Sequence, residues 1–212
     1  MFGLRREEAF PRRAMQLPLF PLKTVLFPGG VLPLKVFEQR YIEMTKACLR
    51  DEQPFGVCLI TQGDEVAATK AGAGAPEFAP IGTLATITAW DMPQLGILHL
   101  RTSGGPRIQV KSHSMRDDGL AIGEVTTLPA EPVVALADAY APLARLVEML
   151  ADRVGAEYFP EPRALDDSSW VGYRLAELLP LPLRIKQSML EINDSDVRLK
   201  VLEQFLRRQG LL

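Results

Sequence analysis

The chain is poor in the residues that build metal centres and disulfide frameworks. Its 212 residues include two cysteines, Cys48 and Cys58, and two histidines. These side chains cannot supply a four-ligand zinc set or a disulfide framework. We therefore expect both cysteines to be small buried side chains in a reducing compartment. No metal or other cofactor is predicted.

Excess charge of one sign and long apolar runs are also lacking. Lys and Arg number 24 against 26 Asp and Glu, which leaves a net charge of −2. The chain therefore lacks the excess of positive charge that binding to a phosphate backbone requires. No stretch approaches the roughly 20 apolar residues that cross a bilayer, and no apolar signal segment precedes the first charges after Met1. These absences predict a cytoplasmic protein with no nucleic-acid or membrane partner.

Sequence motifs of common enzymes are missing. A glycine- and alanine-rich stretch, residues 61–80, is predicted to be a mobile loop. Its Lys70 is followed by Ala71, so it lacks the phosphate-loop pattern G-x-x-x-x-G-K-[ST]. No G-x-S-x-G nucleophile motif accompanies His99 and His113, which are predicted to lie in neighbouring strands. An acid–base site formed by these histidines with Asp91 or Asp117 stays open as an alternative.

What is present is a change of pattern along the chain. Residues 1–16 mix Arg, Glu and Pro without periodicity and predict a flexible arm, with translation starting at Met1 or at Met15. Residues 17–130 alternate apolar and polar positions between turn residues, as strands do. Residues 131–212 switch to helical spacing. We therefore expect an arm over 1–16, a β-rich domain over 17–130 and a helical domain over 131–212.

The pattern also predicts individual elements. Pro and Gly divide the first apolar stretch into two short strands, and a helix without Gly or Pro follows. Turns are expected at 91–94, 103–106 and 117–119. Asp166 and Asp167 are interpreted as the start of a helix rather than as catalytic carboxylates. The expected strands are 17–21, 31–36, 55–60, 81–90, 97–102, 107–112 and 120–125, and the expected helices are 37–51, 133–154, 168–179, 182–191 and 194–209.

The opening LPLFPLKTVLFPGGVLPLKVFEQRY at residues 17–41 resembles that of the Lon amino-terminal domain, the substrate-recognition module of the ATP-dependent Lon protease. Gly56-Val57, Gly82-Thr83, Gly105 with Arg107, Leu178-Leu179-Pro180 and residues 186–191 also resemble family positions, so the resemblance covers about 17–206. It implies an α+β fold, in which a twisted, partly closed PUA-like β-barrel with an inserted helix precedes a C-terminal helical bundle. The chain contains no Walker A sequence and no region like the protease's Ser-Lys dyad, so a freestanding, non-catalytic member is expected.

The expected function is recognition of unfolded or extended polypeptide, as an adaptor for a protease or chaperone, with the oligomeric state left open. Arg107 is predicted to pin a turn or to pair with an acid, with binding of an anion or of peptide as the alternatives. A small-molecule hydrolase or transferase using a cleft of the barrel is one alternative. An RNA-binding module is another, which a basic stripe of Arg101, Arg107, Lys111 and Arg116 would support. The apolar candidates for peptide contact, each also explained as a core residue, are Phe37, Tyr41, Phe78, Trp90 and Met92.

Overall fold

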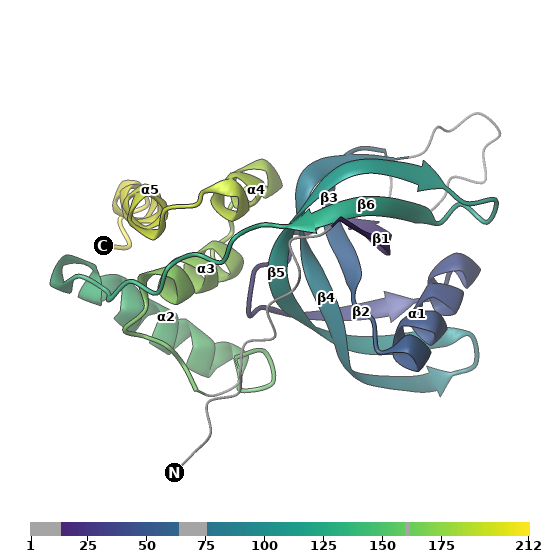
Figure 1. Cartoon of the computed structure of the whole chain (residues 1–212). Coiled ribbons are helices and arrows are strands. Elements are labelled where there is room, and N and C mark those ends of the chain that lie inside the picture. Colours follow the sequence, from purple (N-terminus) through teal and green to yellow (C-terminus); the bar gives the residue numbers. More distant parts are fainter. Residues whose placement is uncertain (1–13, 64–75, 160–161) are drawn as a thin grey trace, which may run out of the picture.

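The structure is a computed structural model that describes residues 14–63, 76–159 and 162–212. A six-stranded sheet with one helix against it is followed by a helical region, so the fold is mixed α/β (Figure 1). Most of the predicted arm and of the predicted loop at 61–80 falls outside the described residues. The strands are β1 Met15–Leu22, β2 Val31–Val36, β3 Phe55–Gln62, β4 Glu77–Gln94, β5 Ile97–Met115 and β6 Ala121–Thr127. The helices are α1 Gln39–Asp51, α2 Ala141–Val154, α3 Ser168–Leu178, α4 Leu183–Glu191 and α5 Ser195–Arg208, with a 3-10 turn at Asp138–Tyr140.

Strand β1 holds two prolines although it has neighbours on both sides. It pairs with β6 over residues 15–19 and with β3 over residues 19–22, so the two partners overlap only at Leu19. Pro18 and Pro21 each lie where one side of β1 is unpaired. This arrangement accommodates residues that lack a backbone N–H without loss of a ladder hydrogen bond. The strand begins at Met15, two residues inside the predicted arm.

The strand order is β2-β5-β4-β3-β1-β6, and β6 also pairs with β5. The pairings β5–β4, β4–β3, β3–β1, β1–β6 and β6–β5 therefore form a closed circuit. Strand β2 lies outside this circuit and pairs with the first part of β5. Among the described residues, β2 consequently has a single strand neighbour.

The predicted turn at 103–106 is wrong, because β5 runs without a break from Ile97 to Met115. Gly104 permits a close approach of two backbones rather than a reversal of direction. Its N–H donates to the Gly30 carbonyl at 2.8 Å, and its own carbonyl accepts from the Gly29 N–H at 2.7 Å. A Cβ at Gly104 would lie 2.2 Å from the Phe27 carbonyl oxygen. The strand thus continues past the loop before β2 instead of folding back.

The helical region differs from the prediction mainly at its start. Residues 133–137 are not helical, because Ala135 forms an antiparallel bridge with Asp167 and the Ser168 N–H donates to the Val134 carbonyl. Helix α2 begins at Ala141, with Pro142 in its first turn, where a missing N–H has no effect on the helix. Asp167 caps α3 by accepting from the Ser169 N–H, which confirms the Asp166-Asp167 interpretation.

One buried cluster joins the sheet to the helices. Phe27 and Leu59 pack with Leu143, Val171 and other residues of α2 to α5 in a single core. A second core lies under α1, where the ring of Tyr41 stacks on that of Phe20. The change from strands to helices falls near residues 128–137, while the division into separate domains stays a prediction. None of the helices in the described part of the chain is long and apolar enough to cross a bilayer.

Candidate functional site

The hairpin between β4 and β5 reverses direction later than predicted. We expected a turn at 91–94, but β4 continues to Gln94 and the turn is formed by Leu95 and Gly96. Gly96 has φ of +83°, a conformation that favours glycine in two-residue hairpin turns. Register shifts between Ile87 and Ala89 and between Asp91 and Gln94 mark irregular pairing near this end.

Four large apolar side chains are exposed around this turn, and we call them the hairpin patch: Phe37, Trp90, Met92 and Leu95. Their exposed fractions are 56%, 56%, 38% and 93%. Trp90 pairs with Leu100 on β5, and Phe37 follows Val36, which pairs with Leu98. The register therefore brings the four residues to one end of the sheet. Leu95 was not among the contact residues expected from the sequence. The glycine that follows it was the signal for a turn in which the Leu95 side chain is exposed.

Two of the predicted contact residues lie in the interior instead. Tyr41 is 4% exposed, and its ring packs between Phe20 and the Arg40 guanidinium. Arg107 is also 4% exposed, and it donates to the carbonyls of Leu190 and Ile192. Neither side chain is placed to meet a polypeptide at the surface. Of the roles expected for Arg107, pairing with an acid is the one observed.

Phe78 lies far from the hairpin patch. It is near the start of β4, twelve positions before Trp90, which corresponds to up to about 40 Å of extended chain. Its ring is half-buried and packs against that of His113 with centroids 4.8 Å apart. The predicted set of contact residues is therefore divided, and only Phe37, Trp90 and Met92 are brought together.

A buried charge cluster lies where the sheet meets the helices. The Glu131 side chain is 5% exposed and accepts hydrogen bonds from Arg198, Tyr173 and Ser169, the last at 2.7 Å. Arg107 lies 3.7 Å from the same carboxylate. Burial alone would raise the pKa of Glu131, but the hydrogen bonds from these partners hold it below its usual value. We call these five residues the Glu131 cluster. The partners of the carboxylate are all side chains of the protein itself, so we assign the cluster a role in stability.

The constellations considered for other functions are not assembled among the described residues. His99 lies opposite Asp91 in the β4–β5 register, but the Asp91 carboxylate accepts from the Met92 N–H. His113 lies on the same strand as His99, β5, rather than on a neighbouring strand, and is fourteen positions away. Within the described ranges, no group of three His, Cys, Asp or Glu side chains is arranged to hold a metal ion. The basic stripe that RNA binding would need is broken, because Arg107 is buried.

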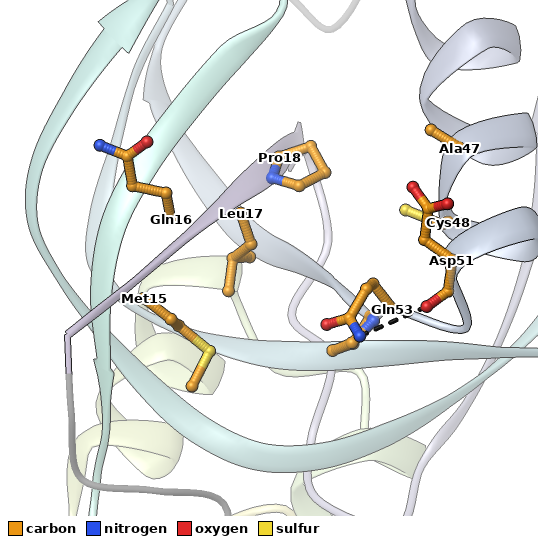
Figure 2. Close-up of a pocket in the computed structure, with 9 residues that line it drawn as sticks. Met15, Gln16, Leu17, Pro18, Ala47, Cys48, Asp51 and Gln53 are labelled. Atoms are coloured by element: carbon orange, nitrogen blue, oxygen red, sulfur yellow. Dashed lines mark hydrogen bonds between the residues drawn. The ribbon is translucent and has the colours of Figure 1, made fainter.

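A cavity of about 220 Å³ lies between α1 and the start of β1 (Figure 2). Ala47, Cys48 and Asp51 of α1 form one side and residues 15–18 of β1 another, and the Gln53 amide donates to the Asp51 carbonyl. The cavity is lined mainly by apolar side chains, and its polar lining residues are Gln16, Asp51 and Gln53. The polar groups do not converge on one point, as they do in a catalytic pocket.

The two cysteines allow a test of how well the protein interior is shielded from reagents. Both are free and buried, as the sequence predicted. Burial raises the pKa of Cys48 to about 11, from an ordinary value of 9.0, and that of Cys58 to about 12. At pH 8 the Cys48 thiolate is thus about 100-fold scarcer than in an ordinary cysteine. We expect iodoacetamide to label the folded protein at least about 10-fold more slowly than the unfolded protein, with mass spectrometry as the readout; equal rates would contradict the burial.

The fold and the patch define a class: a mixed α/β domain whose sheet displays apolar side chains at one hairpin. The model of the family described as ATP-dependent protease La (LON) substrate-binding domain matches residues 16–208. The chain belongs to this family, as its opening sequence indicated.

Individual relatives agree with this assignment. The chain is 29% identical over 213 residues to Lon protease 2 of Myxococcus xanthus, covering 98% of this chain and 25% of that protein. It is 29% identical over 199 residues to Lon protease of Anaeromyxobacter dehalogenans, covering 91% and 23%. It thus spans about a quarter of the length of these relatives.

Solved structures show the same fold. The crystal structure of Lon N-terminal domain protein from Xanthomonas campestris is 36% identical, with a TM-score of 0.72 over 90% of this chain and 98% of that one. The N-terminal domain of Mycobacterium avium complex Lon protease is 19% identical, with a TM-score of 0.56 over 89% and 96%, a likeness of fold alone.

Proposed function

We propose that this chain is a non-catalytic module that recognises unfolded or extended polypeptide. The hairpin patch is the observation that carries the proposal, because it gathers four exposed apolar side chains at one end of the sheet. Exposed clusters of this kind mark interaction sites in soluble domains. Aromatic anchors such as Phe37 and Trp90 supply much of the binding energy at protein interfaces. Membership of a substrate-binding domain family supports the same role.

We further propose that the bound polypeptide is passed to a protease or chaperone in the cytoplasm. The matched relatives are Lon proteases of about four times this length, which supports a link to proteolysis. The two free thiols favour a reducing compartment. The closed circuit of strand pairings supports a PUA-like barrel, and the contacts of α3 with α2, α4 and α5 support a helical bundle.

A triple substitution tests the role of the hairpin patch. We expect Phe37→Ser, Trp90→Ser and Leu95→Ser together to weaken binding of a reduced, carboxymethylated polypeptide by at least about 10-fold, because several anchors are lost at once. Fluorescence anisotropy of the labelled polypeptide measures the affinity. The fold should persist, since these side chains are mostly exposed.

The matched control is Val133→Ser, which removes an apolar side chain that is 85% exposed outside the patch. Its affinity should equal that of the wild type. The proposal fails if the wild type binds no unfolded polypeptide, or if the triple variant and the control bind equally well.

A further inference from the structure

Among the described residues, the outer edge of β2 carries backbone groups that no strand satisfies. The closed circuit leaves no other strand of the described sheet with an entire free side, and β2 pairs with β5 alone. No backbone hydrogen bond joins residues 31–36 to any other described segment. Exposed strand edges are templates for pairing with another extended chain.

The register fixes which groups face outward. The Gly104 N–H donates to the Gly30 carbonyl and the Thr102 hydroxyl donates to the Leu32 carbonyl, so both carbonyls face β5 across the antiparallel ladder. Hydrogen-bonded and non-hydrogen-bonded pairs alternate along such a ladder. Leu32, Leu34 and Val36 are therefore bonded to β5, opposite Thr102, Leu100 and Leu98. The intervening residues Val31, Pro33 and Lys35 direct their backbone groups away from the sheet.

Pro33 agrees independently with this assignment. Proline has no N–H, and in sheets it occurs where the missing donor would face away from the ladder. The outer edge then offers two donors, the N–H groups of Val31 and Lys35, and three acceptors, the carbonyls of Val31, Pro33 and Lys35. The side chains of Pro33 and Lys35 are exposed, and no described strand other than β5 pairs with β2.

The two ends of this edge differ in chemistry. A cavity of about 160 Å³ adjoins Val31 and Pro33 and is lined also by Arg101, Glu157 and Tyr158. At the other end, Val36 leads directly into Phe37 of the hairpin patch. The six residues between these ends span about 20 Å. The edge is therefore continuous with the patch that the proposed function uses.

We propose that an extended polypeptide segment binds along β2 as an added strand. The inference rests on the proposed function and names its mode: main-chain hydrogen bonds to Val31, Pro33 and Lys35 hold the segment, and the hairpin patch holds its apolar side chains. Backbone pairing of this kind tolerates many sequences. It selects for extended segments and against proline at the facing positions. Pro33 removes one donor from the edge, which weakens permanent pairing between copies of the chain.

The N–H of Lys35 provides the sharpest test. Lys35→Pro removes this donor, and Lys35→Ala removes the side chain but keeps the donor. We expect Lys35→Pro to bind the reduced, carboxymethylated polypeptide at least about 5-fold more weakly than Lys35→Ala, since one net hydrogen bond contributes about 1 kcal/mol. Pro33→Val adds a donor at the centre of the edge, and we expect it to bind a few-fold more tightly.

Amide hydrogen exchange, measured by NMR on the wild type, keeps the test independent of the folding of any variant. The amides of Val31 and Lys35 should exchange rapidly in the free protein and become protected when the polypeptide binds. Those of Leu34 and Val36 should be protected in both states, because they bond to β5.

Each outcome has a distinct meaning. If the triple variant of the hairpin patch loses binding while Lys35→Pro and Lys35→Ala bind equally, recognition stands and strand addition is wrong. If no form of the protein binds the polypeptide, the proposed function itself fails. If the Lys35 amide is already protected in a concentration-dependent dimer, a second copy occupies the edge and the inference is overturned.

Discussion

Glu131→Gln is expected to lower the free energy of unfolding by about 3–5 kcal/mol, the usual result of breaking a buried ion pair. The substitution leaves Arg198, whose side chain is fully buried, without its carboxylate partner. Tyr173 and Ser169 lose an ionised acceptor, and Arg107 loses its nearest opposite charge. Denaturant unfolding followed by circular dichroism measures the change. For a chain of this size, the melting midpoint should fall by roughly 10 °C.

The pH dependence has a definite sign. The folded-state pKa of Glu131 lies below its ordinary value of 4.5, so the folded protein favours the ionised form. Its contribution to stability is fully present above the unfolded-state pKa and is lost as the pH falls through the folded-state pKa. The stability difference between wild type and Glu131→Gln should therefore be constant from pH 6 to 8 and shrink below about pH 4.5.

Glu148→Gln is the matched control, because Glu148 is an exposed residue on α2. It should change the free energy of unfolding by less than about 0.5 kcal/mol. A Glu131→Gln protein as stable as this control would show that the buried arginines do not depend on the carboxylate.

Gly104→Ala is expected to destabilise the protein by about 2–4 kcal/mol, as severe overpacking does. The added Cβ would lie 2.2 Å from the Phe27 carbonyl oxygen and 3.1 Å from its carbonyl carbon. The obstacle is backbone, so no side-chain rotation relieves it. Separating the two segments would also break the hydrogen bonds of Gly104 with Gly29 and Gly30.

The neighbouring Gly105→Ala serves as control. A Cβ there meets nothing closer than Leu84, at 3.6 Å, which is ordinary contact. We expect its free energy of unfolding to stay within about 1 kcal/mol of the wild type, measured by the same denaturant titration. If both alanine variants were equally stable, the close approach at Gly104 would not exist in solution.

Local chemistry made much of the fold predictable. Helix α1 follows from a stretch without Gly or Pro and with one apolar stripe. The cap of α5 was predicted from Asp194, whose carboxylate accepts from the N–H groups of Asp196 and Val197. The family motif at 37–41 also concerns the fold: Arg40 donates to the Gly119 carbonyl, and Tyr41 packs in the core. Such residues identify the family because they build its architecture.

Long-range contacts account for what the sequence did not predict. The sequence Gly104-Gly105-Pro106 is typical of a turn. The strand continues instead, because the backbone of Phe27 packs directly against Gly104, a contact that the local sequence does not indicate. Glu131 lies between Ala130 and Pro132, in a segment with the composition of a linker. Its burial depends on hydrogen-bond partners that are 38 to 67 positions away. Phe37 and Tyr41 are both aromatic and lie in the same motif, so the sequence does not distinguish them. The structure shows that the Phe37 ring is exposed and the Tyr41 ring is buried.

Arg107, which joins the sheet to the helices, also makes the two regions of the chain depend on each other. Arg107 of β5 donates to the carbonyls of Leu190 and Ile192, and Gln187 of α4 donates to the Ile81 carbonyl of β4. These acceptors are main-chain atoms, so the tail can vary in sequence while it keeps its path. A gene rearrangement that joined this sheet to an unrelated tail would leave a buried guanidinium without acceptors. We therefore expect the two regions to be stable when they are transferred together as one cassette, and to lose stability when either is exchanged alone.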